Sequence, residues 1–156
     1  MACSCIVPDF PIDCCSIYEP KPKKIPSVAV LQPFASLIAW GIIDLSVTNF
    51  FVKYRGPLLI VSDTEVFEGP SLVKPTALEY YNANAEIMPR GVALAVVDLV
   101  DCRKMTSDDE AAALVPFLNG LYSWSMKNPR LVEPFEVEIG RGLFHIPEKR
   151  VLFSHF

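Results

Sequence analysis

Two basic side chains beside a tyrosine are the residues whose types and spacing best suit the binding of an anion. Lys53 and Arg55 flank Tyr54, and the Tyr-Arg-Gly-Pro sequence after Lys53 is typical of a turn. Further cations are spread over the later sequence, among them Arg90, Arg103, Lys104, Arg130 and Arg141. If these cations converge in the fold, they would form a phosphate-binding rim, on which Tyr54 or Trp124 could stack a base. If they do not converge, they are solvated loop charges, and Arg55 only braces the fold.

Four of the five cysteines lie near the start of the chain and could in principle supply metal ligands. They are Cys3, Cys5, Cys14 and Cys15. Structural zinc sites favour a Cys-x2-Cys spacing within a folded frame, and this segment has neither feature. We therefore expect these thiols to bind no metal, with zinc, lipidation and redox chemistry as the alternatives. Cys102 ends an apolar run, so we expect it to be a small core residue rather than a nucleophile.

The overall composition weakens the case for nucleic-acid binding without removing it. The chain has 156 residues, enough for one domain, and a formal net charge of −4. Proteins whose affinity rests on phosphate contacts are usually basic. No apolar run approaches the roughly 18 to 20 residues that cross a bilayer, and the first residues lack the pattern of a secretory signal. We therefore expect a cytoplasmic protein without membrane contact, and we expect no cofactor.

The spacing of apolar residues predicts the elements that would position these side chains. Residues 1–27 are rich in cysteine and proline, which predicts an irregular tail before a single domain at 28–156. Apolar runs in the domain predict strands at 28–31, 43–48, 58–61, 91–100, 121–126, 135–138 and 142–146. Start and stop residues predict helices at 33–41, 77–85 and from Thr106 or Ser107 to about 115. Phe50 and Phe51 are adjacent, so one of them should face a cleft or loop.

Three blocks of sequence occur in the order found in one known family. The first holds Gln32-Pro-Phe-Ala35, Gly41 and Tyr54-Arg-Gly-Pro-Leu-Leu-Ile60. The second is the strand from Gly91 to Cys102, and the third runs from Tyr122 through Asn128-Pro-Arg130 to Phe144. In this order they resemble the ASCH domain, the activating signal cointegrator homology family of PUA-like proteins. The resemblance covers roughly residues 28 to 147. It implies an α+β fold, a PUA-like mixed β-barrel with peripheral helices, and a ligand cleft between the first helix and the barrel.

The chain departs from the family pattern at the positions that carry its chemistry. The lysine that follows the family's glycine is Ile43 here, its glutamate is Ser46, its arginine is Thr48, and the histidine after the Leu-Leu-Ile strand is Val61. A small-hydrolase branch of the family deacylates modified cytidines with a threonine, a lysine and a glutamate, and Ser46 falls about where that threonine sits. A hydroxyl is a poor nucleophile unless a base or amine activates it, and Ile43 supplies neither.

The resemblance and its departures together predict a non-catalytic module that binds RNA or a nucleotide in the cleft. The candidate ligand-binding residues are Lys53, Tyr54, Arg55, Ser46, Thr48 and Trp40. No residue is assigned a catalytic role. One alternative is a small hydrolase, either an amidohydrolase or a nuclease, that acts on modified nucleosides or RNA, and the missing lysine argues against it. The other alternative is a protein-interaction module, which nothing in the sequence favours positively.

Overall fold

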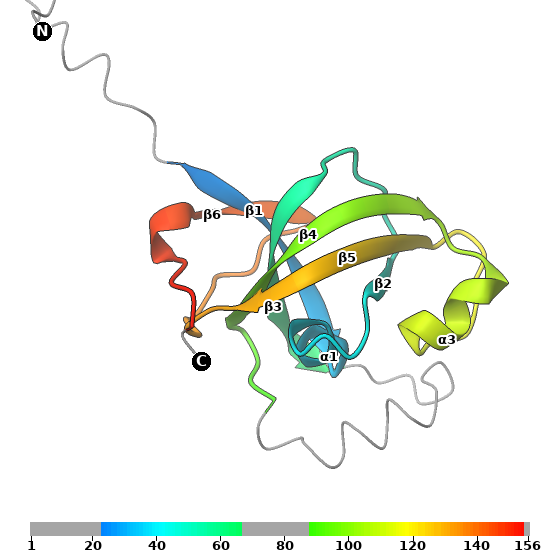
Figure 1. Cartoon of the computed structure of the whole chain (residues 1–156), viewed down its shortest axis with the longest axis horizontal. Helices are drawn as coiled ribbons and strands as arrows, with labels where there is room; N and C mark the ends of the chain where they lie inside the picture. Colours follow the sequence, from blue (N-terminus) through cyan, green and yellow to red (C-terminus); the bar gives the residue numbers. More distant parts are fainter. Residues whose placement is uncertain (1–22, 67–87, 155–156) are drawn as a thin grey trace, which may run out of the picture.

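A six-stranded mixed sheet, curved around a short helix, forms the frame of the molecule (Figure 1). The computed structural model describes residues 23–66 and 88–154. Its strands are β1 (Lys24–Gln32), β2 (Leu45–Thr48), β3 (Gly56–Val66), β4 (Ala93–Lys104), β5 (Tyr122–Leu131) and β6 (Leu143–Pro147). They are ordered β2-β5-β4-β3-β1-β6 across the sheet. The β1–β3 pair is parallel, and the other neighbours are antiparallel.

The α+β class and the mixed sheet agree with the prediction, whereas closure into a barrel is not observed. Among the described residues the ladder of hydrogen-bonded strands ends at β2 on one side and at β6 on the other. Pairing between β1 and β6 runs only from Lys24 to Val28. The rest of β1 therefore keeps one edge without a neighbouring strand, and the sheet is open beside it.

Several strand boundaries differ from those predicted, because strand pairing extends beyond the apolar runs. β1 begins at Lys24 rather than at residue 28, since its first residues pair with β6. β3 and β4 also continue past their apolar cores, to Val66 and Lys104. The strand predicted at 135–138 was wrong. Only Glu136 forms an isolated bridge there, and the apolar residues of that segment pack on the sheet face instead.

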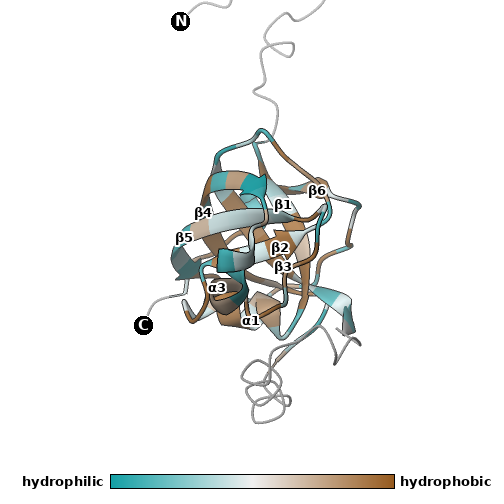
Figure 2. Ribbon diagram, turned by 90° about the vertical axis from the view of Figure 1, so that its right-hand side faces the viewer, coloured by the Kyte–Doolittle hydropathy of each residue, from teal (hydrophilic) through white to brown (hydrophobic). Residues whose placement is uncertain are grey.

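The core lies on both faces of the sheet, because the central strands are apolar on both sides. Leu58 and Ile60 of β3 pack into one cluster, whereas Leu59 and Val61 pack into a second cluster on the opposite face. Helix α1 (Phe34–Ala39) covers the first face, and all six of its residues are buried. Figure 2 shows this helix as an apolar segment next to the strands. α1 contacts β1, β2, β3, β4 and β5 and so lies within the curve of the sheet.

Helix α1 begins and ends at the residues that the sequence indicated. Pro33 is its N-cap, and Gly41 follows it with a φ of +75°, a left-handed conformation that glycine adopts without a steric penalty. The buried Gln32 amide holds the start of the helix in place. Its nitrogen donates to the Ser36 hydroxyl (2.8 Å) and to the Pro89 carbonyl (2.7 Å), and its oxygen accepts from the Ser36 main-chain N–H (3.0 Å).

The remaining helices are single turns. A 3-10 turn, η4 (Ser107–Asp109), leads into α3 (Glu110–Ala113), with Thr106 as the N-cap that the sequence indicated. A second turn, η5 (Glu148–Arg150), follows β6. The helix predicted at 77–85 and the cysteines at 3, 5, 14 and 15 lie outside the described residues. Within 23–66 and 88–154, no helix is long and apolar enough to span a membrane.

Candidate functional site

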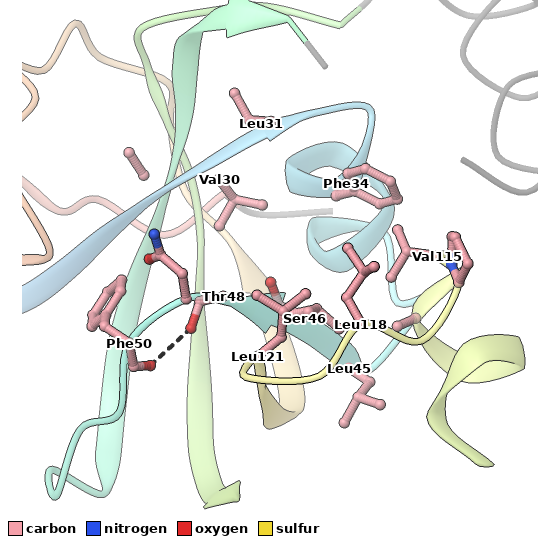
Figure 3. A pocket seen from close by; sticks show the side chains of 15 residues that line it. Val30, Leu31, Phe34, Leu45, Ser46, Thr48, Phe50, Val115, Leu118 and Leu121 are labelled. Carbon is pink, nitrogen blue, oxygen red and sulfur yellow. Dashed lines mark hydrogen bonds between the residues drawn. The ribbon is translucent and has the colours of Figure 1, made fainter. Parts of the chain in front are cut away.

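A cavity of about 320 Å³ opens between β1, α1, β2 and the loop that follows α3 (Figure 3). Its lining residues are Ala29, Val30, Leu31, Phe34, Leu45, Ser46, Val47, Thr48, Asn49, Phe50, Ala113, Val115, Pro116, Leu118 and Leu121. The position follows from the open sheet, because the part of β1 beyond Val28 and the edge strand β2 form two of the walls. The cavity therefore lies in the region where the family resemblance implied a cleft.

The lining of this cavity is apolar and uncharged. None of the fifteen lining residues carries an ionisable side chain, and only Ser46, Thr48 and Asn49 carry polar ones. Phe34 and Phe50 contribute the aromatic surface. The volume is at the lower end of the range for small-molecule sites, which are mostly apolar with a few placed polar groups. The cavity thus suits a small, uncharged ligand with one polar edge.

Ser46 and Thr48 lie on the same side of β2 but differ in how their hydroxyls are engaged. The Thr48 hydroxyl donates to the Phe50 main-chain carbonyl at 2.9 Å. Ser46 is only 5% exposed, and its hydroxyl has no hydrogen-bond partner within the described parts of the chain. The Ser46 oxygen is not among the enclosed side-chain atoms that lack a partner, so it keeps contact with the cavity. Ser46 is therefore a largely buried lining residue whose hydroxyl is open to a ligand.

A buried tryptophan fixes the residues at the end of β2. Trp124 is fully buried opposite Ser46, and its indole N–H donates to the Phe50 carbonyl at 3.2 Å. The Phe50 ring meets the Trp124 ring edge-on, with 5.1 Å between centroids, and lines the cavity. Phe51 is 48% exposed. This confirms the expectation that one of the two adjacent phenylalanines faces a cleft and not the core.

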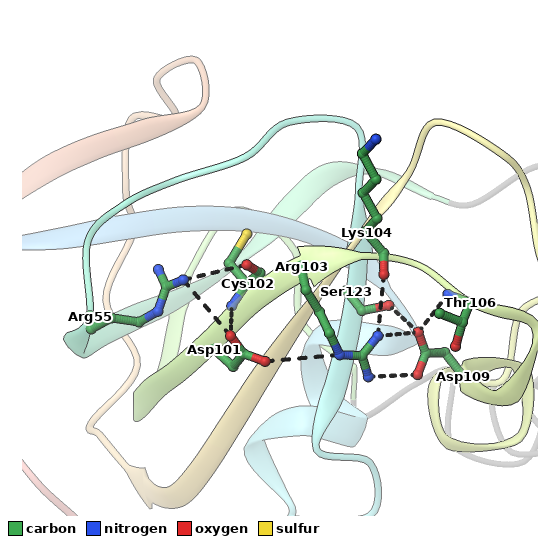
Figure 4. Close-up of polar contacts among 8 residues, drawn as sticks. All are labelled: Arg55, Asp101, Cys102, Arg103, Lys104, Thr106, Asp109 and Ser123. Atoms are coloured by element: carbon green, nitrogen blue, oxygen red, sulfur yellow. Dashed lines mark hydrogen bonds and ion pairs between the residues drawn. The ribbon is translucent and has the colours of Figure 1, made fainter.

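A buried carboxylate anchors the loop that forms the outer wall of the cavity (Figure 4). The Asp109 carboxylate accepts hydrogen bonds from both terminal nitrogens of Arg103 (2.7 and 2.8 Å), from the Ser123 hydroxyl (2.8 Å) and from the Thr106 main-chain N–H (2.9 Å). The Arg103 hydrogen bonds hold the pKa of the Asp109 carboxyl far below its usual range. This network joins the start of α3 to β4 and β5, and it thereby positions the loop at 114–121.

The predicted basic turn does not line the cavity. The Arg55 guanidinium donates to the main-chain carbonyls of Val52 (2.9 Å), Tyr54 (2.8 Å) and Cys102 (3.4 Å), and it lies 3.9 Å from the Asp101 carboxylate (Figure 4). Arg55 thus bonds to the part of β4 that continues past its pairing with the first residue of β3, Gly56. This is the bracing role that the sequence left open as an alternative to ligand binding.

Tyr54 is also engaged by its own turn. Its hydroxyl donates to the Pro57 carbonyl at 2.6 Å, so the ring folds back over Gly56. A side chain at Gly56 would approach the Tyr54 hydroxyl to 3.0 Å, and its φ of +131° is one that other residues rarely adopt. Burial raises the pKa of the Tyr54 hydroxyl, and the nearby Asp98 carboxylate raises it further. The turn therefore needs glycine at this position.

The remaining candidate ligand-binding residues do not all lie at the cavity. Ser46 and Thr48 line the cavity, whereas Trp40 lies 37% exposed at the end of α1 and Lys53 is exposed on the loop before β3. Among the scattered cations, Arg130 pairs with Asp98 (2.8 Å), and hydrogen bonding from Arg130 lowers the pKa of the Asp98 carboxyl. The described residues include no cluster of three or more side chains able to hold a metal ion.

Sequence reasoning did not identify much of the cavity wall. Phe34 was placed only within the predicted helix at 33–41, and the apolar run from Val115 to Leu118 had no assigned role. The signal was present, because this run follows a single-turn helix and leaves Phe117 and Leu118 exposed by 38% and 43%. An apolar run in a loop marks either core packing or a cavity wall, and only the tertiary arrangement distinguishes them.

Comparison with known proteins identifies the fold but no family. No protein-family model matches the sequence, and no curated protein matches it significantly. Among solved structures, the chain is similar to a crystal structure of a mutant of ZmASCH from Zymomonas mobilis, with a TM-score of 0.50 and 8% sequence identity. The match covers 81% of this chain and 93% of that one. At this identity the likeness shows a shared ASCH-like fold and nothing about activity.

The two hydroxyls of β2 should respond differently to removal. We expect Ser46→Ala to leave the free energy of unfolding within about 0.5 kcal/mol of the unmodified chain, or to raise it, because no internal hydrogen bond is lost. Thr48→Val should lower it by about 1 kcal/mol, because the bond to the Phe50 carbonyl is lost. Urea unfolding measures both. A large destabilisation by Ser46→Ala would show that this hydroxyl serves the fold.

The hydrogen bonds to the Asp109 carboxylate should make the free energy of unfolding fall at low pH. A carboxyl whose pKa is lowered on folding stabilises the native state above its unfolded pKa of about 3.9, and this contribution is lost as the pH falls below it. Asp109→Asn should therefore cost about 2 to 3 kcal/mol at neutral pH and flatten the acid dependence below about pH 5. Unfolding at several pH values tests this, with the exposed Asp108→Asn as control. Equal acid profiles for both variants would contradict it.

Proposed function

We propose that this domain is a member of the ASCH family that binds RNA or a nucleotide without catalysing a reaction, and that it receives an uncharged base in the cavity. The observation that carries the proposal is the hydroxyl of the largely buried Ser46, which lines an apolar cavity and has no hydrogen-bond partner among the described residues. The ASCH-like fold and the order of the sequence blocks support the family assignment.

A nucleobase suits this lining better than a phosphate does. A base has two apolar faces and one polar edge, which match aromatic and aliphatic walls with a few hydrogen-bonding groups. Phe34, Phe50 and Val30 offer such walls, and Ser46 and Asn49 offer a hydroxyl and an amide for the edge. A phosphate would instead need cations or several donors, and none of the lining residues is basic.

The hydrolase alternative requires an activating group that the lining does not supply. A hydroxyl nucleophile needs a neighbouring base or an amine of lowered pKa. Within residues 23–66 and 88–154 no lysine, histidine or carboxylate lines the cavity. The residue at the family's lysine position, Ile43, is 6% exposed and belongs to the core cluster. A binding role that uses the Ser46 hydroxyl as a hydrogen-bonding group requires no such activation.

Calorimetric titration with cytidine, uridine, adenosine and guanosine tests the proposal. We expect at least one nucleoside to bind. The affinity for its 5′-monophosphate should lie within a few-fold of the affinity for the nucleoside. Ser46→Ala should weaken binding roughly two- to tenfold, as expected for one neutral hydrogen bond. Ser107→Ala, which alters an exposed serine of η4, should change nothing. If no nucleoside binds, or if binding requires the phosphate, the base does not occupy this cavity.

The protein should not hydrolyse acylated nucleosides. Incubation with N4-acetylcytidine, followed by chromatography, should yield no cytidine above the rate without protein, because the cavity lacks a proton acceptor for the Ser46 hydroxyl. Release of cytidine that is abolished by Ser46→Ala would place the chain among the hydrolases.

A further inference from the structure

Three side chains form a row across neighbouring strands at the solvent end of the cavity. Thr48 of β2 lies directly opposite Tyr122 of β5, and Tyr122 lies directly opposite Lys104 of β4. The next row inward consists of the buried residues Ser46, Trp124 and Cys102. Facing residues of an antiparallel pair point to the same side of the sheet. Tyr122 and Lys104 therefore point to the face that carries the cavity, next to its lining residue Thr48.

An exposed aromatic ring covers this row. The Phe51 ring lies over Tyr122, with 5.8 Å between centroids and an angle of 59° between the planes, and Phe51 is 48% exposed. Its neighbour Phe50 points into the cavity. Two adjacent residues thus present one ring inside the cavity and one ring just outside it. An exposed phenylalanine over a partly buried tyrosine, beside a base-sized cavity, offers a surface of the kind on which proteins stack the bases of single-stranded nucleic acids.

Two lysines are close to the aromatic pair in register or in sequence, because Lys104 lies opposite Tyr122 and Lys53 follows Phe51 by two residues. Lys104 follows Arg103 on β4, and the two side chains point to opposite sides of the strand (Figure 4). Arg103 is held by Asp109, whereas neither Lys104 nor Lys53 makes an ion pair within the described residues. The whole chain has a net charge of −4, so these unpaired lysines do not simply follow from a generally basic protein. Their charge is complementary to that of a phosphate.

We propose that the Phe51–Tyr122 pair stacks a second base, and that the ligand is therefore a short single-stranded oligonucleotide rather than a mononucleotide. Lys53 and Lys104 then contact the phosphates that join this base to the one in the cavity. Facing residues of an antiparallel pair are about 4.5 to 5.5 Å apart at their Cα atoms, which is within reach of one step along a single strand. This inference rests on the proposed function, because the cavity supplies the first base position.

Fluorescence anisotropy with labelled hexaribouridylate, hexaribocytidylate and hexariboadenylate tests the second position. We expect the best of these to bind about tenfold or more tightly than its nucleoside. Phe51→Ala should remove about tenfold of the oligonucleotide affinity and leave the nucleoside affinity unchanged, and Phe51→Trp should restore the loss. Phe51 is half exposed, so its replacement should leave the unfolding midpoint nearly unaltered. The matching deoxyribo-oligomers show which nucleic acid is preferred.

Salt dependence tests the lysines separately. The logarithm of the affinity falls with the logarithm of the salt concentration, with a slope of about 0.7 for each phosphate contact of a single strand. Lys104→Gln should reduce this slope by about 0.7, and the double change Lys53→Gln with Lys104→Gln should reduce it by about twice that. Lys149→Gln, which alters an exposed lysine of η5, should leave it unchanged. Equal slopes in all variants would overturn the phosphate assignment.

The outcomes separate this inference from the function on which it rests. If nucleosides bind in a Ser46-dependent manner but oligonucleotides bind no more tightly, the second base position is refuted and the cavity assignment stands. If nucleosides do not bind but oligonucleotide binding depends on Phe51, the aromatic position stands and the cavity assignment fails. If neither binds, while an acidic peptide rich in aromatic residues does, both proposals are overturned and the interaction module is the correct alternative.

Discussion

The main-chain carbonyl of Phe50 is the point on which the geometry of the site depends. It accepts hydrogen bonds from the Thr48 hydroxyl and from the indole N–H of the fully buried Trp124. These bonds end β2 and fix the chain direction at the two adjacent phenylalanines, so that Phe50 lines the cavity and Phe51 faces solvent beside Tyr122. Because Thr48 is occupied in this way, Ser46 remains as the buried hydroxyl available to a ligand.

The sheet places these groups because it is left open. β6 covers only the first part of β1, so a cavity remains where a further strand would otherwise lie against β2. Helix α1 forms its inner wall, and the loop after α3, anchored through Asp109, forms its outer wall. Among the described residues the sheet does not close into the predicted barrel, and the cavity lies beside its open edge.

Local signals in the sequence indicated the helix and strands around the cavity, whereas the fold class and the cleft were implied by the family resemblance. Pro33 and Gly41 bound α1, and alternation along β2 placed Ser46 and Thr48 on one face. The sequence did not reveal that Arg55 bonds to the Cys102 carbonyl, because that contact depends on the pairing of β3 with β4, which begins at Gly56. The grouping of Phe51, Tyr122 and Lys104 likewise depends on strand register, which links residues far apart in the sequence. Isolated polar and aromatic residues thus gain their roles only through long-range pairing.

The chemistry that the cavity can support follows from its apolar lining. Ile43 lies in the core, and none of the described lining residues is charged, so under the proposed function recognition rests on shape, aromatic surface and the Ser46 hydroxyl. Nuclear magnetic resonance mapping of the isotope-labelled protein with an excess of uncharged nucleoside tests this account most directly. The account predicts that the largest amide shifts fall on Ser46, Phe50 and Val115 around the cavity. Shifts confined to the turn at 53–55, or no shifts at all, would contradict it.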